Sequence, residues 1–190
     1  MTDKYQARRS ALLEQIYELI DREGYEALRV RYLCGRLGIS TGTFYHYFPE
    51  KYELHQLLYR RIDEHFQRRV QPRFTEDEAA NLSLFAECYA DYCVQTGVAA
   101  TRCFMALPLQ QPAGDLLSEK RPISQVLEGI FERGKAKNQF LCPHSARECA
   151  RYTMVVLRGF CSDWAKRDGS YDLVEAVRRF FPISLAGLRG

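Results

Sequence analysis

A glycine between two short helical patterns constrains this chain more than any other feature. Leu33 and Leu37 stand four residues apart, so they share one face of a short helix. Gly38 follows at once, where a helix that stops abruptly favours a residue in the left-handed conformation. A second short pattern covers residues 41–48, with Phe44 and Phe48 again four residues apart. Two helices joined by so short a turn must cross steeply, which leaves one face of the second helix free.

That free face carries polar and aromatic groups. Ser40 stands where it can cap the helix, and the N–H groups at the helix start favour a phosphate. Gly42 costs about 1 kcal/mol of helix propensity relative to alanine, which suggests that DNA must approach the backbone closely there. A helix presented in this way fits a major groove about 12 Å wide. The segment therefore predicts a DNA-binding helix-turn-helix, in which Phe44 and Phe48 are core residues.

The run from Leu33 to Leu54 also resembles the signature of the tetracycline-repressor (TetR) family of bacterial transcription regulators. The resemblance rests on the sequence Gly-Thr-Phe-Tyr-His-Tyr-Phe at residues 42–48, followed by Lys51 at the start of the next helix. One departure is Arg29, which stands where the family commonly has a threonine cap, so that cap is weak or comes from elsewhere. The residues to which the resemblance assigns DNA contacts are Val30, Arg31, Thr41, Gly42, Thr43, Tyr45, His46, Tyr47 and Lys51.

Helical spacing continues to the end of the chain, so we predict an all-α protein. We expect a helix-turn-helix DNA-binding domain at residues 1–50 and a larger helical ligand-binding and dimerisation domain at residues 51–190, with 51–74 as a connecting helix. Residues 75–78 are the best boundary by composition, and Pro182 should kink or split the last helix. The predicted helices cover residues 5–23, 30–37, 41–48, 51–72, 81–96, 98–107, 122–138, 145–167 and 171–188.

Composition places the chain among globular proteins. Hydrophobic residues make up 46% of it, yet no apolar run approaches the roughly 20 residues that a membrane span needs. Residues 1–6 lack the apolar core of a secretory signal. Residues 1–74 hold 13 basic against 10 acidic residues, whereas residues 75–190 hold 14 of each, so the net charge of +3 lies with the helix-turn-helix. We expect a cytoplasmic protein, at the nucleoid when bound to its operator, with no membrane partner.

The last two predicted helices carry more apolar surface than a lone small domain needs. The resemblance implies that this family pairs its last two long helices into an intermolecular four-helix bundle, so a homodimer through residues 145–188 is expected. The alternative is that the same residues fill only the monomer core. The apolar residues in question are Ala150, Met154, Leu157, Phe160, Cys161, Trp164, Leu173, Val174, Val177, Phe180, Phe181, Ile183, Leu185 and Leu188.

The resemblance further implies a small-molecule pocket in the larger domain, and most often a repressor that an inducer releases from its operator. An inducer must then bind the DNA-incompetent state more tightly. Apolar residues with a few polar tips are the expected lining, although aromatic and methionine residues at helical spacing are more often plain core. The candidates are Tyr89, Cys93, Phe104, Met105, Phe131, Met154 and Trp164.

Seven cysteines leave two further interpretations open. An odd number of cysteines within helical patterns is typical of reduced thiols. A thiol-based redox-sensing regulator is one alternative, through Cys88, Cys93 and Cys103. Metal binding is another, but its spacing fits no standard zinc pattern and lacks a fourth ligand, and no metal is expected. The residues that it would use are Cys142, His144 and Cys149.

Enzymatic chemistry finds little support in the sequence. The chain has no glycine-rich phosphate loop, no His-Glu-x-x-His motif and no nucleophile elbow. We therefore expect no catalytic residue and no cofactor. A helical ligand-binding protein without DNA affinity is the remaining alternative, and salt-dependent DNA binding would distinguish the two.

Overall fold

The structure is a computed structural model that describes residues 3–23, 29–49, 52–110 and 117–189. All regular structure in these ranges is helical, which confirms the predicted all-α class. The chain divides into two compact units, residues 1–58 and 59–190. The acidic interval at 75–78 therefore lies inside the second unit and is not the point of division. Within the described residues, no helix combines the length and apolar character needed to cross a membrane.

The first unit is built from three helices around a small core. They are α1 (Asp3–Glu23), α2 (Val30–Leu37) and α3 (Thr41–Tyr47). Phe44 and Phe48 are fully buried, and their ring centroids lie 5.1 Å apart. They are therefore core residues, as predicted from their spacing. The buried core of this unit consists of Leu12, Ile16, Leu19, Leu33, Cys34, Phe44 and Phe48.

The turn between α2 and α3 has the expected geometry. Gly38 adopts the left-handed conformation with φ 64° and donates its N–H to the Cys34 carbonyl. Ser40 caps α3, because its hydroxyl oxygen accepts from the Thr43 N–H at 3.0 Å. Arg29 makes no side-chain capping hydrogen bond at the start of α2, in keeping with the missing threonine. Both ends of this turn are thus stabilised by local contacts.

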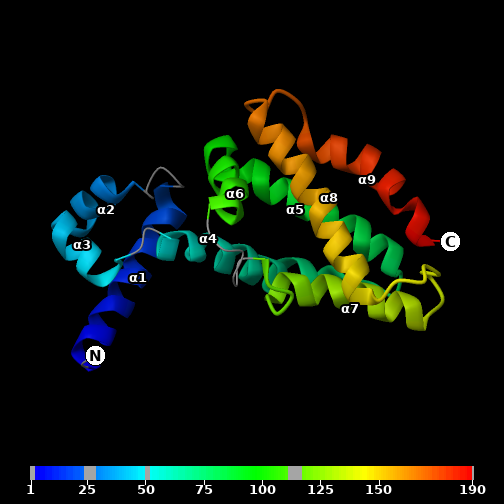
Figure 1. Cartoon of the computed structure of the whole chain (residues 1–190), viewed down its shortest axis with the longest axis horizontal. Helices are drawn as coiled ribbons and strands as arrows, with labels where there is room; N and C mark the ends of the chain where they lie inside the picture. Colours follow the sequence, from blue (N-terminus) through cyan, green and yellow to red (C-terminus); the bar gives the residue numbers. More distant parts are fainter. Residues whose placement is uncertain (1–2, 24–28, 50–51, 111–116, 190) are drawn as a thin grey trace. The chain divides into compact units, whose positions relative to one another are not determined.

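The second unit is a helical bundle. Its helix α8 packs against α6, α7 and α9, and α5 packs against α7 and α9 (Figure 1). The helix α4 begins among the residues of the first unit and ends in the second. The elements are α4 (Tyr52–His65), a π-helix η2 (Phe66–Val70), a 3₁₀-helix η3 (Gln71–Arg73), α5 (Glu78–Thr96), α6 (Val98–Gln110), α7 (Pro122–Ala136), α8 (Ala146–Lys166) and α9 (Leu173–Arg189).

Pro72 lies at the end of a helical run, as predicted, whereas Pro182 does not split its helix. The expected helix over 51–72 ends as α4 at His65, and its last turns are a π-helix and a 3₁₀-helix before and around Pro72, which has no N–H to continue the ladder. Pro182, in contrast, lies inside α9, which continues to Arg189 and is not split. Phe181 beside it is buried, so this part of α9 packs against the rest of the unit.

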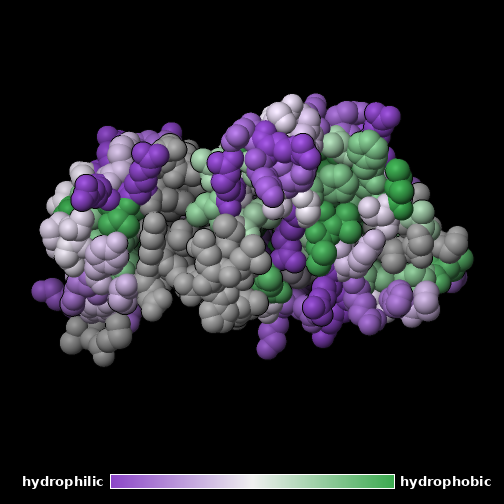
Figure 2. Space-filling model, turned by 45° about the horizontal axis from the view of Figure 1, so that its top comes forward, coloured by the Kyte–Doolittle hydropathy of each residue, from purple (hydrophilic) through white to green (hydrophobic). Residues whose placement is uncertain are grey.

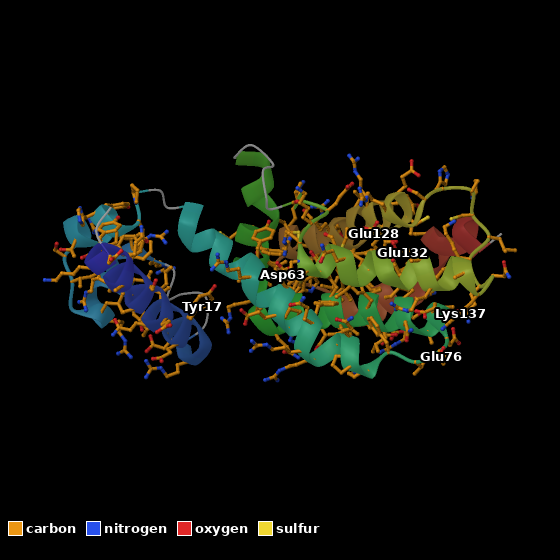
Figure 3. The ribbon with its side chains drawn as sticks, turned by 90° about the horizontal axis from the view of Figure 1, so that it is seen from below. Tyr17, Asp63, Glu76, Glu128, Glu132 and Lys137 are labelled. Carbon is orange, nitrogen blue, oxygen red and sulfur yellow. The ribbon has the colours of Figure 1, made fainter. Side chains whose placement is uncertain are left out.

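A charge cluster joins the start of α5 to the end of α7. The Glu78 carboxylate accepts hydrogen bonds from Arg133 at 2.8 Å and Lys137 at 3.1 Å. Figure 3 shows Lys137 close to Glu76, to whose carboxylate its Nζ donates at 2.7 Å. Burial raises the pKa of the Glu78 carboxyl, but hydrogen bonds from Arg133, Asn81 and Lys137 outweigh it and hold the pKa below its usual value. The Glu78 carboxylate therefore stays ionised and forms ion pairs with Arg133 and Lys137.

Candidate DNA-binding surface and ligand cavity

Helix α3 separates its residues into a buried and an outward face. Phe44 faces the core, while the outward residues of α3 are exposed except Tyr47, which is half-buried. At the start of α2, Val30 is half-buried and Arg31 is exposed. Lys51 lies outside the described residues. The exposed residues of α3 among the DNA-contact candidates are Thr41, Gly42, Thr43, Tyr45 and His46.

Helix α1 holds the C-terminal end of α3 in place. The Tyr5 hydroxyl donates to the His46 carbonyl at 2.9 Å, and Arg9 Nε donates to the Tyr47 carbonyl at 3.2 Å. The Tyr5 ring also stacks on the Tyr47 ring, with centroids 5.0 Å apart. These bonds satisfy carbonyls that a helix end leaves without intrahelical partners. Sequence reasoning missed Tyr5 and Arg9, because partners about 40 residues away leave no periodic signal.

Gly42 is not required by packing within the unit. A Cβ built on it would meet only the Ser40 Oγ, at 3.7 Å, which is an ordinary van der Waals contact. The Thr43 hydroxyl lies 2.9 Å from the same Ser40 Oγ, so it belongs to the cap as well as to the surface. Glycine lowers the stability of a helix interior. Contacts within the described residues therefore do not explain why a glycine stands at this position.

The second unit contains a cavity of about 630 Å³. This volume falls within the range of about 300–1,000 Å³ that is usual for small-molecule sites. The Tyr89 hydroxyl, fully buried in its wall, has no hydrogen-bond partner among the described residues. Burial raises the pKa of Tyr89 well above its usual value, so the group remains a neutral donor. The apolar and aromatic wall is formed by Tyr59, Ile62, Tyr89, Phe104, Leu117, Ile123, Ala150, Met154 and Val155.

Basic side chains outnumber acidic ones around this cavity. Arg147 pairs with Glu128 at 3.3 Å and with Glu119 at 3.5 Å, and Arg121 is paired as described below. The other cations form no ion pair with any described carboxylate. An unpaired cation near an apolar wall favours a ligand that carries an anionic group. These cations are Lys120, Arg151 and Arg158.

The wall contributed by α4 is fixed to the start of α7. Asp63, labelled on α4 in Figure 3, accepts from Arg121 at 2.8 Å and 3.2 Å and from the Ile123 N–H at 3.3 Å. Arg121 also donates to the Tyr59 carbonyl at 3.2 Å and lies 4.6 Å from the centre of the Tyr59 ring. Burial raises the pKa of Asp63, although Arg121 opposes the shift. Sequence reasoning missed Asp63 and Arg121, which are 58 residues apart.

The structure brings together three of the seven predicted ligand residues. Tyr89, Phe104 and Met154 line the cavity. The others are absent from its described lining. Met105 is half-buried in α6, and the remaining three, Cys93, Phe131 and Trp164, lie in the core. The Trp164 indole N–H donates to the Tyr171 carbonyl at 3.0 Å, so its role is in packing.

The outer face of α8 and α9 also differs from the predicted apolar set. Much of that set faces inward in the monomer: Leu157, Cys161, Trp164, Leu173, Val177 and Phe181 are buried. Another row of α8 is exposed instead, and Figure 2 shows hydrophobic side chains gathered over α8 and α9. A groove of about 750 Å³ runs there past Gly159, Phe160 and Phe180. The side chains of Leu185 and Leu188 lie outside the described residues. We call Tyr152, Val155, Phe180 and Ile183 the outer apolar face; they are 46%, 54%, 45% and 70% exposed.

Two short helices joined by a tight glycine turn, with a buried aromatic core and an outward polar face, define a helix-turn-helix regulator of transcription. Residues 12–57 match the family model described as "Bacterial regulatory proteins, tetR family", so this part of the chain has the DNA-binding segment typical of that family. No curated protein matches the chain.

Two solved structures have a similar fold. One is the fatty acid degradation regulator FadR from Bacillus halodurans, with 21% identity and a TM-score of 0.60, covering 94% of this chain and 98% of that one. The other is a transcriptional regulator FadR from Bacillus subtilis in complex with stearoyl-CoA. Its identity is 18% and its TM-score 0.64, and the match covers 93% of this chain and 97% of that one. Both likenesses concern the fold alone.

Proposed function

We propose that this protein is a transcriptional repressor that binds its operator as a homodimer and is released by a long-chain acyl thioester of coenzyme A. The observation that carries the proposal is the cavity of the second unit, where apolar walls, a buried unpaired Tyr89 hydroxyl and unpaired cations surround one space. This combination suits a ligand with an apolar chain, one polar acceptor and an anionic end.

The DNA contacts follow from the chemistry of the residues of α2 and α3 that lie away from the core. Arg31 and Tyr47 are suited to phosphates, which fix the position of the protein without reading sequence, and the ammonium of Lys51, which lies outside the described residues, suits them as well. Thr43 and His46 can reach base edges in the major groove. Gly42 allows the DNA to approach the start of α3, where free N–H groups favour a phosphate.

The acyl thioester fits the cavity in three parts. Its chain would lie against Ile62, Phe104 and Met154, its carbonyl oxygen would accept from the Tyr89 hydroxyl, and its phosphates would meet Lys120 and Arg151. The stearoyl-CoA bound to the FadR neighbour from Bacillus subtilis supports this class of ligand. A buried hydroxyl without a partner costs about 1–3 kcal/mol, so a ligand that supplies an acceptor regains part of that energy.

Ligand binding would reach the DNA-binding domain through α4. Tyr59 and Ile62 line the cavity, and they belong to the same helix that begins at Tyr52 within the first unit. A chain that enters the cavity would contact α4, which the Asp63–Arg121 pair fixes to the start of α7. Two sites coupled through one helix typically change each other's affinity by about 5–150-fold.

The homodimer would form through the outer apolar face. Four large hydrophobic side chains exposed on adjacent helices form a patch of the kind that marks an interface. A dimer also places two recognition helices on half-sites about 34–36 Å apart, or a multiple of that distance. The DNA-binding domain at residues 1–50, the ligand-binding and dimerisation domain at 51–190 and a cytoplasmic location complete the proposal.

Calorimetric titration tests the ligand class. Stearoyl-CoA should bind more tightly than either coenzyme A or stearate alone, since the apolar wall and the unpaired cations each hold one part of it. Replacing Lys120 and Arg151 together with alanine should weaken stearoyl-CoA binding by about 1–3 kcal/mol. Arg68→Ala, at an exposed arginine outside the cavity lining, is the matched control. Equal binding of stearate and stearoyl-CoA would contradict a role for the cations.

A further inference from the structure

We propose that Cys142 and Cys149 form a reversible disulfide when a hydroperoxide reaches them. Cys142 lies in the loop between α7 and α8, and Cys149 lies near the start of α8. Their Sγ atoms are 3.1 Å apart. A disulfide bond is about 2.05 Å long, so the two sulfurs need to approach by about 1 Å. Only six residues separate the two cysteines, so the bond would join neighbouring segments of the chain.

The surroundings give the two sulfurs different roles. Lys135 Nζ donates to the Cys142 carbonyl at 2.5 Å, which places an ammonium beside this cysteine. Burial raises the pKa of the Cys142 thiol, but the hydrogen bond with Cys149 and the charge of Lys135 outweigh it and lower the pKa. For Cys149, burial followed by the Cys142 contact raises the pKa to about 12. Cys142 is therefore the nucleophile, and the Cys149 thiol is the proton donor beside it.

The reaction balances with hydrogen peroxide as the oxidant. The Cys142 thiolate attacks one peroxide oxygen, the O–O bond breaks, and hydroxide leaves with a sulfenic acid formed on Cys142. The Cys149 sulfur then attacks the sulfenic sulfur, the S–S bond forms and the S–O bond breaks. The thiol proton and one proton from solvent convert the two leaving oxygens into water. Two thiols are thus oxidised by two electrons, and one peroxide is reduced to two water molecules.

The oxidant must be small, because both thiols are nearly covered. Cys142 is 5% exposed and Cys149 is 1% exposed. The residues on either side of Cys142 in the chain, Leu141 and Pro143, are exposed, so the loop lies at the surface. Hydrogen peroxide is small and uncharged, whereas glutathione disulfide needs an exposed sulfur for direct exchange.

The Cys93–Cys161 pair and Cys88 differ from this arrangement. Cys161 has its thiol hydrogen bonded to Cys93, but both lie in the core, and that bond together with burial raises the pKa of Cys161 well above its usual value. Cys88 is half-buried and accepts from Arg73 at 3.4 Å, and burial raises its pKa. The alternative of a thiol sensor at Cys88, Cys93 and Cys103 involves other cysteines than the pair proposed here. Among the described residues no group of three possible metal ligands occurs.

Oxidation would also reach the proposed ligand site. Arg147, Ala150 and Arg151 line the cavity and flank Cys149 in α8. A disulfide between Cys149 and Cys142 in the preceding loop would shift the first turns of α8, where these cavity residues lie. This consequence depends on the proposed function, whereas the disulfide itself does not.

Peptide mapping tests the disulfide directly. The purified full chain is treated with hydrogen peroxide, free thiols are blocked under denaturing conditions, and the protein is digested with trypsin. Trypsin cleaves after Lys137, Arg147 and Arg151, so Cys142 and Cys149 fall on separate peptides, residues 138–147 and 148–151. We expect these two peptides to appear joined, lighter than their sum by two hydrogens, and to separate on reduction with dithiothreitol. Absence of the joined pair, with Cys142 recovered unmodified or as a sulfonic acid, would overturn the proposal.

Three variants assign the roles. Cys149→Ser should leave a sulfenic acid on Cys142 that dimedone traps, and Cys142→Ser should protect Cys149 from oxidation. Cys88→Ser is the matched control and should leave the joined peptides unchanged. Oxidation of Cys149 in the Cys142→Ser variant, at the rate seen in the parent, would refute the assignment of the nucleophile. Because the readout is a covalent bond, the result is independent of DNA binding and of acyl-CoA binding.

Discussion

Replacing Gly42 with alanine should separate stability from DNA affinity. Alanine in a helix is favoured over glycine by about 0.5–1 kcal/mol, and the new Cβ meets only the Ser40 Oγ at 3.7 Å. The first unit should therefore become more stable by roughly that amount. The added methyl group occupies the space through which we propose that DNA approaches α3. Overpacking of a close contact costs about 1–3 kcal/mol, which corresponds to a rise in Kd of about 5–150-fold.

Two assays and one control variant test this prediction. Urea unfolding reports the stability, and fluorescence anisotropy of labelled DNA from upstream of the gene reports the affinity. Gly35→Ala is the control, because Gly35 is exposed in α2 and a Cβ on it would have no atom within 4 Å. It should add similar stability and leave the affinity unchanged. If Gly42→Ala bound this DNA as tightly as the parent, the close approach at α3 would be refuted.

Three further predictions concern the second unit. Tyr89→Phe should leave the ligand-free protein as stable or more stable, because it removes an unpaired buried hydroxyl, and it should weaken stearoyl-CoA binding by about 1 kcal/mol in calorimetry. Ile183→Glu should convert dimers into folded monomers in analytical ultracentrifugation, whereas Leu141→Glu, at a residue 64% exposed outside the outer apolar face, should not; a dimeric Ile183→Glu protein would exclude that face. Glu78→Gln should lower the free energy of unfolding at pH 7 by about 1–3 kcal/mol. Because the pKa of Glu78 is lowered in the folded state, its contribution is present above the ordinary value of 4.5 and disappears as the pH falls through the folded pKa, so the variant should lose less stability on acidification. If the free energy of unfolding fell with pH in the same way in the parent and in Glu78→Gln, Glu78 would not contribute to stability through its ionised form.

Local features of the fold could be predicted from the sequence. Gly38 and Ser40 act through atoms no more than a few residues away, and so the turn and the cap were predictable. The bounds of α2, residues 30–37, agree with the prediction for the same reason. The π-helix at the end of α4 was not predictable, because its hydrogen-bond pattern depends on packing that leaves no recognisable pattern in the sequence.

Contacts between distant residues could not be predicted. The pairing of Asp63 with Arg121 joins residues 58 positions apart, with no spacing rule to connect them. Helix α8 presents apolar residues on more than one face, so periodicity alone could not decide which row faces inward. Packing against α6, α7 and α9 takes Leu157 and Trp164 into the core and leaves Val155 at the surface.

Titration of upstream DNA with and without acyl-CoA tests the proposed function most directly. Fluorescence anisotropy at low salt should show tight binding by the ligand-free protein, with an affinity that falls as salt rises because phosphate contacts release counterions. Saturating stearoyl-CoA should weaken this binding by about 5–150-fold, and coenzyme A alone should not. The proposed function would be contradicted by a ligand-free protein that fails to bind at low salt, or by stearoyl-CoA that binds the protein and leaves its DNA affinity unchanged.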